Sequence, residues 1–289
     1  MDVIDTPLGT FQLLEKTGFG RWSEIHRVVE ADSGQILALK IFTQYAMNPA
    51  SCAAALRREA NAAHQLAGCH PHNDYMFCVA LDVTTVYYQG NAVPALLLPF
   101  CDGITMADWL QMQPPLSSRI VVLHKLLRAL AGLHDTGLAH NDLSLGNVMI
   151  GADTITLIDF DRAQPTDVHQ ADHPAARIGA FYDECCIGQA ADLRAFSILI
   201  CIVLGNAHPF TDDLLGLLQG REPHSDLLSR PPTIPHLPFA TSEQTEVIDA
   251  WLTPLLRMQR PALTRALLSS WPFRDFMSTP APSLLSPPQ

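Results

Sequence analysis

Two short segments near the middle of the chain constrain its fold most, because each sets acidic or amide side chains beside a strand-like apolar run. They read Ala139-His140-Asn141-Asp142-Leu143-Ser144-Leu145-Gly146-Asn147-Val148-Met149-Ile150 and Leu157-Ile158-Asp159-Phe160-Asp161. Asp142 precedes the amide Asn147 by five residues, and Asp159 ends the second apolar run. Hard cations such as Mg²⁺ take oxygen ligands, usually one or two carboxylates together with substrate phosphates. Two acids and an amide on adjacent loops therefore indicate divalent-metal and phosphate chemistry.

The length and the charge of the chain narrow the function classes. Its 289 residues allow one two-lobed domain or two small ones. The net charge of −11 argues against a general nucleic-acid binder, because phosphate backbones require clustered Lys and Arg. We therefore expect no nucleic-acid partner, and we expect phosphate binding to depend on a few Lys residues and on metal ions.

The cysteine count and the apolar runs predict a cytoplasmic protein without a membrane span. The seven Cys residues are odd in number and form no Cys-x-x-Cys pair, which favours buried thiols in a reducing compartment. The first ten residues carry two Asp and no apolar core, unlike a signal peptide. The longest apolar run, Phe196–Leu204, has nine residues, too few for a membrane span, and is interpreted as part of a buried helix.

Metal-ligating residue types are crowded into one short stretch, which holds Cys69, His70, His72, Asp74 and Cys78. Their spacing matches no standard zinc pattern. An ordinary loop before a strand is the favoured interpretation of the Cys69–Cys78 region, and a metal site is the alternative.

A glycine pair near the N-terminus joins two strand-like runs. Residues 11–17 lead into Gly18-Phe19-Gly20, and Glu24–Val29 forms the next run. Glycines in such a turn let backbone N–H groups approach phosphates without obstruction by a Cβ atom. A plain turn between two strands is the alternative interpretation.

A buried ion pair is predicted from two charged side chains, a Lys and a Glu, at positions where apolar residues are expected. Lys40 lies in the apolar strand-like run 36–42, where an unpaired ammonium group is costly to bury. The helical segment 51–67, with Ser51 as a candidate N-cap, carries Glu59 on an apolar face whose other members are Leu56, Ala63 and Leu66. An ion pair between Lys40 and Glu59 explains both positions, and a solvated Lys and Glu are the alternative.

Further elements follow from apolar spacing and from capping residues. They are strands at 75–81 and 93–99 separated by a loop at 82–91, and helices at 104–111, 118–135 and 190–205. Ser117 or Ser118 is expected to cap the helix at 118–135, and Gly137 to end it. The helix at 190–205 is apolar on all sides, which is typical of a central buried helix.

In this order the motifs resemble those of protein kinase-like phosphotransferases, whose patterns include H-R-D-L-x-x-x-N and D-F-G. The resemblance covers residues 10–270 and implies an α+β, two-lobed fold. Residues 1–99 would form an N-lobe with a small antiparallel β-sheet and one main helix, and residues 100–276 a larger, mainly α-helical C-lobe. Residues 277–289 are rich in proline and are expected to be disordered.

The resemblance also implies a binding site for ATP. Ala95–Gly103 resembles the hinge of the family, with Leu98 as gatekeeper and the adenine edge facing the backbone of residues 99–101. Lys40, held by Glu59, would grip the α- and β-phosphates. The nucleotide-binding residues implied in this way are Gly18, Gly20, Lys40, Glu59, Leu98, Phe100 and Cys101.

The catalytic roles are implied by the same resemblance. Asp142 would orient the attacking hydroxyl and accept its proton, while Asn147 and Asp159 would hold Mg²⁺, with Mn²⁺ as an alternative metal. Lys40, Asp142 and Asn147 are thus the implied catalytic residues. Asp192, which leads the helix at 190–205, would hold the backbone of the catalytic loop. Further along the chain, Arg260 would pair with Glu184, the acid that ends the activation segment.

The chain departs from the family pattern at several positions. Ser23 stands at the third Gly of the turn, and Asp161 at the Gly of D-F-G, where it either ligates metal or caps the turn. Ser144 and Ala180 stand where protein Ser/Thr kinases usually carry Lys and Thr near the transferred phosphate. Asn141 replaces the Arg before the catalytic Asp.

The loss of that Arg bears on regulation. Without it, a phosphorylated activation segment has no local charge partner to order it. We therefore expect activity that does not depend on phosphorylation of Thr166.

These residues predict an ATP-dependent phosphotransferase, and a protein Ser/Thr kinase is the favoured hypothesis. The pattern His-x-Asp-Leu-x-x-Gly-Asn with Asp-Phe-Asp also resembles phosphotransferases acting on sugars, lipopolysaccharide cores and antibiotics, so a small-molecule or glycolipid kinase is the alternative. A pseudokinase that binds nucleotide without turnover is the third hypothesis. The expected partners are ATP and a protein substrate, with a small-molecule acceptor under the alternative.

Overall fold

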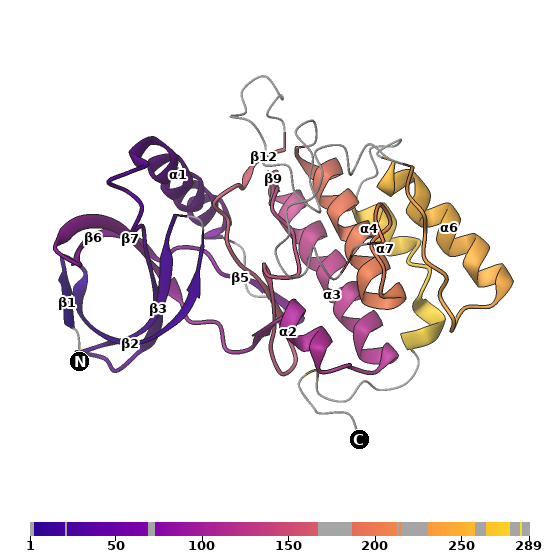
Figure 1. Ribbon diagram of the computed structural model, residues 1–289, viewed down its shortest axis with the longest axis horizontal. Helices are drawn as coiled ribbons and strands as arrows, with labels where there is room; N and C mark the ends of the chain where they lie inside the picture. The colour runs from indigo at the N-terminus through magenta and orange to yellow at the C-terminus, as the bar shows by residue number, and fades with distance from the viewer. Residues whose placement is uncertain are drawn as a thin grey trace. The chain divides into compact units, whose positions relative to one another are not determined.

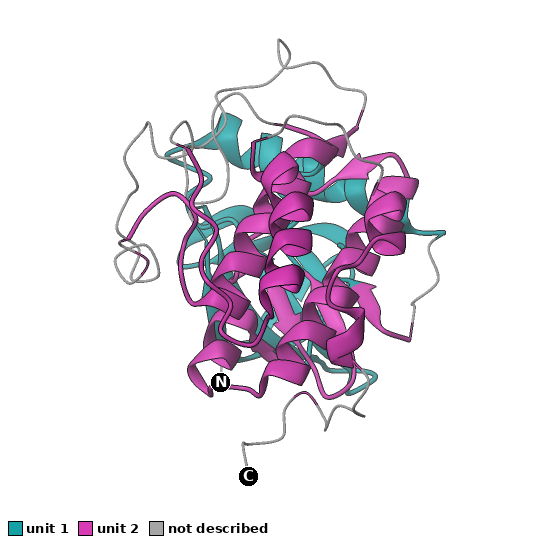
Figure 2. Cartoon of the chain, turned by 90° about the vertical axis from the view of Figure 1, so that its right-hand side faces the viewer, with its two compact units in different colours: residues 1–70, 77–102, 158–163 teal, residues 71–76, 103–157, 164–289 magenta. Residues whose placement is uncertain are grey.

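The computed structural model describes residues 3–20, 22–68, 73–166, 187–212, 214, 231–257, 264–277 and 284 (Figure 1). The chain divides into two compact units. Unit 1 comprises residues 1–70, 77–102 and 158–163, and unit 2 comprises residues 71–76, 103–157 and 164–289 (Figure 2).

Unit 1 is built on an antiparallel six-stranded sheet in the order β1-β2-β3-β4-β7-β6. The strands are β1 (Val3–Thr6), β2 (Gly9–Phe19), β3 (Glu24–Glu30), β4 (Ile36–Ile41), β6 (Asp82–Tyr88) and β7 (Asn91–Pro99). One face carries a buried apolar cluster that includes Phe11, Val28, Leu39, Val86 and Leu97. Because side chains alternate along a strand, Ala38 and Lys40 point to the other face. That face holds a second cluster, in which Ala38 and Leu96 pack with Ala55 of helix α1 (Pro49–Leu66).

Helix α1 begins two residues earlier than its sequence suggests. Pro49 occupies the first turn, where its missing N–H costs nothing, and Asn48 is the N-cap residue without a side-chain hydrogen bond. The expected cap Ser51 is exposed inside the helix. The buried stripe consists of Cys52, Ala55, Glu59, Ala62 and Leu66. Glu59 therefore faces inward as expected, whereas Leu56 and Ala63 are only half-buried.

The expected loop at 82–91 is wrong, because most of it forms β6. Strands β6 and β7 pair in register from Asp82 opposite Leu97 to Tyr88 opposite Asn91. Gln89 and Gly90 make the two-residue turn with φ values of +48° and +83°. Positive φ at both central residues is typical of the tight hairpin turn whose twist matches that of the flanking strands. The β-branched and aromatic run Val83–Tyr88 carried the signal for a strand.

The described helices of unit 2 account for the predicted ones. They are α2 (Met106–Gln111), α3 (Leu116–Asp135), α4 (Gln189–Gly205), α6 (Ser242–Leu256), α7 (Thr264–Ser269) and the short 3₁₀ helix η3 (Arg274–Met277). Helix α3 starts at Leu116 after Pro115, so neither Ser117 nor Ser118 is its cap. Helix α4 is buried from Ala191 to Leu204, which confirms the expected central helix. No helix in the described ranges is long and apolar enough to cross a bilayer.

Short strands frame the loops of unit 2. Strands β5 (Tyr75–Phe77), β11 (Ile155–Leu157), β10 (Val148–Ile150) and β8 (Ile104–Thr105) form one sheet in that order. Strand β9 (Leu138–Ala139) pairs with β12 (Gln164–Pro165). The loop that carries Asp142 therefore runs from β9 to β10, two strands that belong to different sheets.

Some expectations fall on residues outside the described part. Residues 69–72 are among them, so the Cys69–Cys78 region is described only from Asn73 onward. Of residues 278–289 only Leu284 is described, and it is buried. Its carbonyl accepts a hydrogen bond from Nε1 of Trp109 at 2.7 Å, so the proline-rich tail is anchored to α2 at this residue.

Candidate active site

A buried Lys in unit 1 contacts two carboxylates. The ammonium group of Lys40 forms an ion pair with Oε1 of Glu59 and lies 2.6 Å from Oδ1 of Asp159. Lys40 and Glu59 are 6% and 2% exposed, so the pair is shielded from water. The predicted ion pair between strand and helix is confirmed, and Asp159 joins it.

The surrounding charges keep Lys40 ionised. Burial by itself lowers the pKa of Lys40, but Asp159, Glu59 and Asp161 together raise the pKa above its ordinary value. Burial raises the pKa of Glu59 to about 7, against the opposing effect of Lys40. Three carboxylates therefore lie close to the ammonium group of Lys40, while Arg58 and Arg162 add positive charge near Asp161.

The turn at Asp159-Phe160-Asp161 has the donor set of a cation site. Asp159 adopts a left-handed backbone conformation with φ +65°, which is uncommon for a residue other than Gly. A carboxylate oxygen of Asp161 lies within 4.8 Å of one from Asp159. Within the described part of the chain, Oδ1 of Asp161 is buried and accepts no hydrogen bond. Burial and the nearby Asp159 raise the pKa of Asp161. Crowded carboxylate oxygens, one of which accepts no hydrogen bond, fit a hard divalent cation.

The backbone of the same turn is held by helix α1. Nε of Arg58 donates a hydrogen bond to the backbone carbonyl of Asp161. Arg58 directly precedes Glu59, so one turn of α1 holds both Lys40 and the acidic turn. Arg58 could not be recognised from the sequence, because an Arg on an amphipathic helix carries no distinctive signal.

The expected hinge residues line an apolar cluster in unit 1. Leu98 is buried in it, and Phe100 and Cys101 pack against it. Ile25, Ala38 and Ile158 belong to the same cluster, although the sequence analysis gave them no role. Their strand-like apolar pattern predicted burial but could not show which sheet face they share with Leu98. The guanidinium group of Arg27 lies 4.9 Å from the centre of the Phe100 ring, a cation–π contact at the edge of the cluster.

Only one of the two glycines in the glycine-rich segment lies in the connection between strands β2 and β3. Gly18 lies inside β2 and pairs with Ile25, while Gly20 begins the connection to β3. The N–H of Gly20 donates a hydrogen bond to the carbonyl of Ser23 at 2.8 Å. Phe19, between the two glycines, is 84% exposed.

In unit 2, Asn147 holds Asp142 in place. Nδ2 of Asn147 donates hydrogen bonds to the backbone carbonyl of Asp142 at 2.8 Å and to its Oδ2 at 3.0 Å. The acid and the amide that open the first motif are therefore brought together. This contact directs the amide nitrogen of Asn147 to Asp142, which leaves its carbonyl oxygen as the atom suited to a cation.

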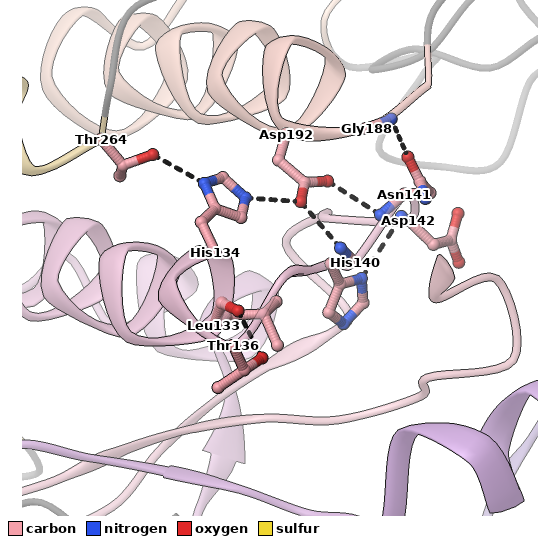
Figure 3. A network of polar contacts seen from close by, with 9 residues as sticks. All are labelled: Leu133, His134, Thr136, His140, Asn141, Asp142, Gly188, Asp192 and Thr264. Atoms are coloured by element: carbon pink, nitrogen blue, oxygen red, sulfur yellow. Dashed lines mark hydrogen bonds and ion pairs between the residues drawn. The ribbon is translucent and has the colours of Figure 1, made fainter. Parts of the chain in front are cut away.

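Asp192 holds the loop that carries Asp142, as predicted. Its carboxylate accepts the backbone N–H groups of His140 at 2.7 Å and Asn141 at 2.8 Å (Figure 3). Nε2 of His134 lies 3.0 Å from the same carboxylate. Burial alone raises the pKa of Asp192, but the hydrogen bonds and the nearby His134 and His140 hold the pKa below its ordinary value.

The partners of Asp192 were only partly visible in the sequence. His134 lies in the last turn of α3, and its Nδ1 is 2.6 Å from Oγ1 of Thr264 at the start of α7 (Figure 3). Both side chains are buried. A lone His on an apolar helix face is usually a satisfied core residue, so only the fold shows that His134 joins α7 to Asp192. Ala180, Glu184 and Arg260 lie outside the described residues, and their expected roles stay predictions.

A β-sheet unit with a buried Lys–Glu pair, together with a mainly helical unit, is the arrangement of a kinase domain. Residues 11–214 match the family described as the protein kinase domain. The match covers more than half of the chain, and this chain belongs to that family. The expected membership of the protein kinase-like superfamily is confirmed.

Curated relatives carry serine/threonine-kinase names. The chain is 28% identical to the probable serine/threonine-protein kinase PknB of Bifidobacterium longum over 162 residues, 55% of this chain and 23% of that protein. It is 27% identical to the serine/threonine-protein kinase PknB of Mycobacterium tuberculosis over 221 residues, 70% of this chain and 33% of that protein. It is 22% identical to the serine/threonine-protein kinase PknE of Mycobacterium bovis over 248 residues, 81% of this chain and 41% of that protein. The chain thus spans between 23% and 41% of the length of these relatives.

Proposed function

We propose that this protein is a Ser/Thr protein kinase that transfers the γ-phosphoryl group of ATP to a hydroxyl of a protein substrate. The observation that carries the proposal is the buried ammonium group of Lys40 between Glu59 and Asp159. A Lys that is buried, ionised and held by a helix is a costly arrangement, and it suits a group that must grip phosphates. The names of the curated relatives favour Ser and Thr as acceptors.

The nucleotide is assigned to unit 1. Adenine would contact the apolar cluster with Leu98, Phe100 and Cys101, and the hairpin with Gly18 and Gly20 would cover the phosphates. Lys40, oriented by Glu59, would bind the α- and β-phosphates as a point charge. The apolar cluster supports this assignment because it provides a dry wall beside a polar, charged one.

The metal is assigned to Asn147 and Asp159. The crowded carboxylate oxygens of Asp159 and Asp161 and the buried Oδ1 of Asp161 fit Mg²⁺, or Mn²⁺ in its place. A bound divalent cation would neutralise charge on the phosphates. Asp161 is either a further ligand or a capping residue of its turn.

Asp142 is assigned the part of the catalytic base. Asn147 fixes its carboxylate, and Asp192 fixes the backbone of its loop. Asp142 would orient the attacking hydroxyl and take its proton as the new bond to phosphorus forms. Phosphoryl transfer depends on positioning and charge neutralisation more than on covalent chemistry, so this set of residues is sufficient.

The larger organisation follows from the same proposal. Residues 1–99 would act as an N-lobe and residues 100–276 as a C-lobe, followed by the tail 277–289. A cytoplasmic location stays a prediction from the cysteine pattern.

A small-molecule kinase is the second candidate function. It is favoured by Ser144, which stands where protein kinases usually carry a Lys, and by the extra carboxylate of Asp161. The pseudokinase reading is disfavoured because Lys40, Asp142, Asn147 and their partners are all present.

Radiolabelled ATP distinguishes these functions. The protein would be incubated with labelled ATP and Mg²⁺ alone, with generic protein substrates, and with sugar or lipid acceptors. Label in protein that disappears in Asp142→Ala, but not in the exposed control Asp153→Ala, would support a protein kinase. Label entering only a small acceptor would establish the second candidate. If no label moves while ATP with Mg²⁺ still raises the melting temperature, the protein binds nucleotide without turnover.

A further inference from the structure

Asn141 joins the loop of Asp142 to the start of helix α4. Its side-chain Oδ1 accepts a hydrogen bond from the backbone N–H of Gly188 at 2.7 Å, and its own N–H donates to Oδ1 of Asp192 at 2.8 Å (Figure 3). Asn141 is 7% exposed, so both bonds are shielded from water. A single residue thus contacts the first turn of α4 through its side chain and through its backbone.

Gly188 is the residue that the side chain of Asn141 holds. It is the N-cap of α4, has φ +79° and offers no side chain to the helix. Its carbonyl accepts the N–H groups of Ala191 and Asp192, so its position sets the start of the helix. The bond from Asn141 therefore fixes the point at which the chain enters α4.

The segment before Gly188 is flanked by a second backbone anchor. Thr166 donates its N–H to the carbonyl of Gly137 at 2.8 Å, just beyond the end of α3. A Cβ atom on Gly188 would lie 3.8 Å from the carbonyl oxygen of Thr166, so the two anchors are neighbours. Both contacts are hydrogen bonds between uncharged groups within unit 2.

The backbone of Asn141 itself is under strain. Its φ is +58°, a left-handed conformation that costs a residue with a side chain about 1–2 kcal/mol. Asn tolerates this conformation better than most residues, because its short amide can form local hydrogen bonds. Strained residues persist where the surrounding structure holds them, and here the holding contacts are Gly188 and Asp192.

We propose that Asn141 is a positioning residue that locks the loop of Asp142 to the first turn of α4 through Gly188. The link is a hydrogen bond between two uncharged groups, so it holds the loop without a phosphorylated residue in the segment that precedes Gly188. This inference rests on the proposed function, because it assigns Asn141 to the support of the catalytic base. It goes further in identifying how a chain that lacks Arg at this position keeps the loop in place.

Three substitutions separate the hydrogen bond from the backbone strain. Asn141→Gly keeps the left-handed backbone and removes the acceptor, whereas Asn141→Ala removes the acceptor and adds strain. Asn141→Asp keeps an acceptor of the same shape. The first readout is amide hydrogen exchange of Gly188 in protein labelled with ¹⁵N-glycine. We expect exchange at Gly188 to speed up at least tenfold in Asn141→Gly and Asn141→Ala, with little change in Asn141→Asp.

The second readout is turnover by protein that phosphatase treatment has freed of phosphate, as checked by intact mass. We expect kcat to fall roughly 10- to 100-fold in Asn141→Gly, a misplacement effect on the base. The KM for ATP should stay within about twofold, since Asn141 is assigned to the support of the catalytic base and not to nucleotide binding. Asn141→Asp should recover most of kcat, and the melting temperature of Asn141→Gly should stay close to that of the natural protein.

Each result that differs from these expectations would contradict one specific part of the proposal. Unchanged exchange at Gly188 in Asn141→Gly would remove the link, and faster exchange with unchanged kcat would remove its positioning role. Loss of activity on phosphatase treatment of the natural protein would show that the neutral link is insufficient. If the natural protein transfers no phosphoryl group, the proposed function fails, while the exchange measurement still decides whether Asn141 holds Gly188.

Discussion

The ammonium group of Lys40 lies 2.6 Å from the carboxylate of Asp159, although 119 residues separate the two in the chain. Glu59 contacts the same ammonium group from helix α1. The charge of Lys40 is therefore shared between the residue proposed to orient it and the residue proposed to hold metal. A second buried carboxylate, that of Asp192, holds the loop of Asp142 through the backbone N–H groups of His140 and Asn141.

Lys40→Met should abolish turnover and destabilise the protein. The variant leaves the buried carboxylate of Glu59 and the partly exposed carboxylate of Asp159 without their cation, and breaking a buried ion pair costs about 3–5 kcal/mol. The matched control is Lys16→Met, whose exposed pair with Glu24 should contribute no more than about 1 kcal/mol. Urea unfolding and ATP turnover measure both effects. Substantial turnover in Lys40→Met would show that another group binds the phosphates.

Glu59→Gln should change the pH dependence of stability. Burial raises the pKa of Glu59 from 4.5 to about 7, so the folded protein binds this proton more tightly than the unfolded chain. The stabilisation that results is complete below pH 4.5 and is lost as the pH rises through about 7. Since Gln stays neutral, this pH-dependent loss should be absent from the variant, so the difference in stability between the two proteins should shift in favour of the variant as the pH rises from 5 to 8.

The measurement is the melting temperature of both proteins across that pH range. Glu246→Gln, at an exposed position on α6, is the control and should show no such trend. A constant difference between Glu59→Gln and the natural protein would contradict the raised pKa. Turnover should fall in Glu59→Gln across this pH range, because Lys40 loses its orienting partner.

Asp192→Asn should destabilise the protein and lower kcat. The carboxylate accepts two backbone N–H groups and contacts His134, whereas an amide offers a single oxygen and adds N–H donors of its own. Leaving a buried donor unpaired costs about 1–3 kcal/mol. Because the pKa of Asp192 is depressed, its stabilising contribution is present above its ordinary pKa of 3.8 and is lost as the pH falls through the lower folded value. The variant lacks this contribution at every pH, so its acid unfolding should begin at a higher pH than that of the natural protein. Identical acid midpoints for the two proteins would argue against a stabilising role of the Asp192 carboxylate.

Asp159→Asn should remove the part of ATP binding that depends on Mg²⁺. At a nucleotide concentration 100 times Kd, binding to the folded state adds about 2.7 kcal/mol to the free energy of unfolding. We expect ATP with Mg²⁺ to raise the melting temperature of the natural protein, and chelation of the metal to reduce the shift. In Asp159→Asn the shift should be small with or without metal, whereas the exposed control Asp153→Asn should behave like the natural protein. A full metal-dependent shift in Asp159→Asn would remove Asp159 from the metal site.

Thr166→Ala should leave turnover nearly unchanged. Thr166 is held by its backbone N–H on Gly137, and an Ala keeps that bond. The substitution removes only the hydroxyl that a regulatory kinase would phosphorylate. A large loss of kcat, restored by Thr166→Glu, would show that phosphorylation orders this part of the chain after all.

Much of the fold was accessible from local patterns. The apolar helix at 190–205 is buried throughout, and the misplaced Lys40 and Glu59 form the predicted pair. The loop predicted at 82–91 failed because its β-branched run was outweighed by polar residues at its ends. The predicted caps of α1 and α3 are wrong because both helices start ahead of the expected serines, α1 at Pro49 and α3 at Leu116 directly after Pro115.

By itself, the sequence identified the chain as a member of the protein kinase family and predicted which residues carry the chemistry, because motif order and spacing are properties of the chain alone. Only the tertiary structure decided what those residues touch. The side chain of Asn141 meets the backbone of Gly188, 47 residues away, and His134 meets Thr264 across 130 residues. Such contacts depend on which helices pack together and on single backbone conformations, and packing is set by the whole folded chain rather than by any one segment of it.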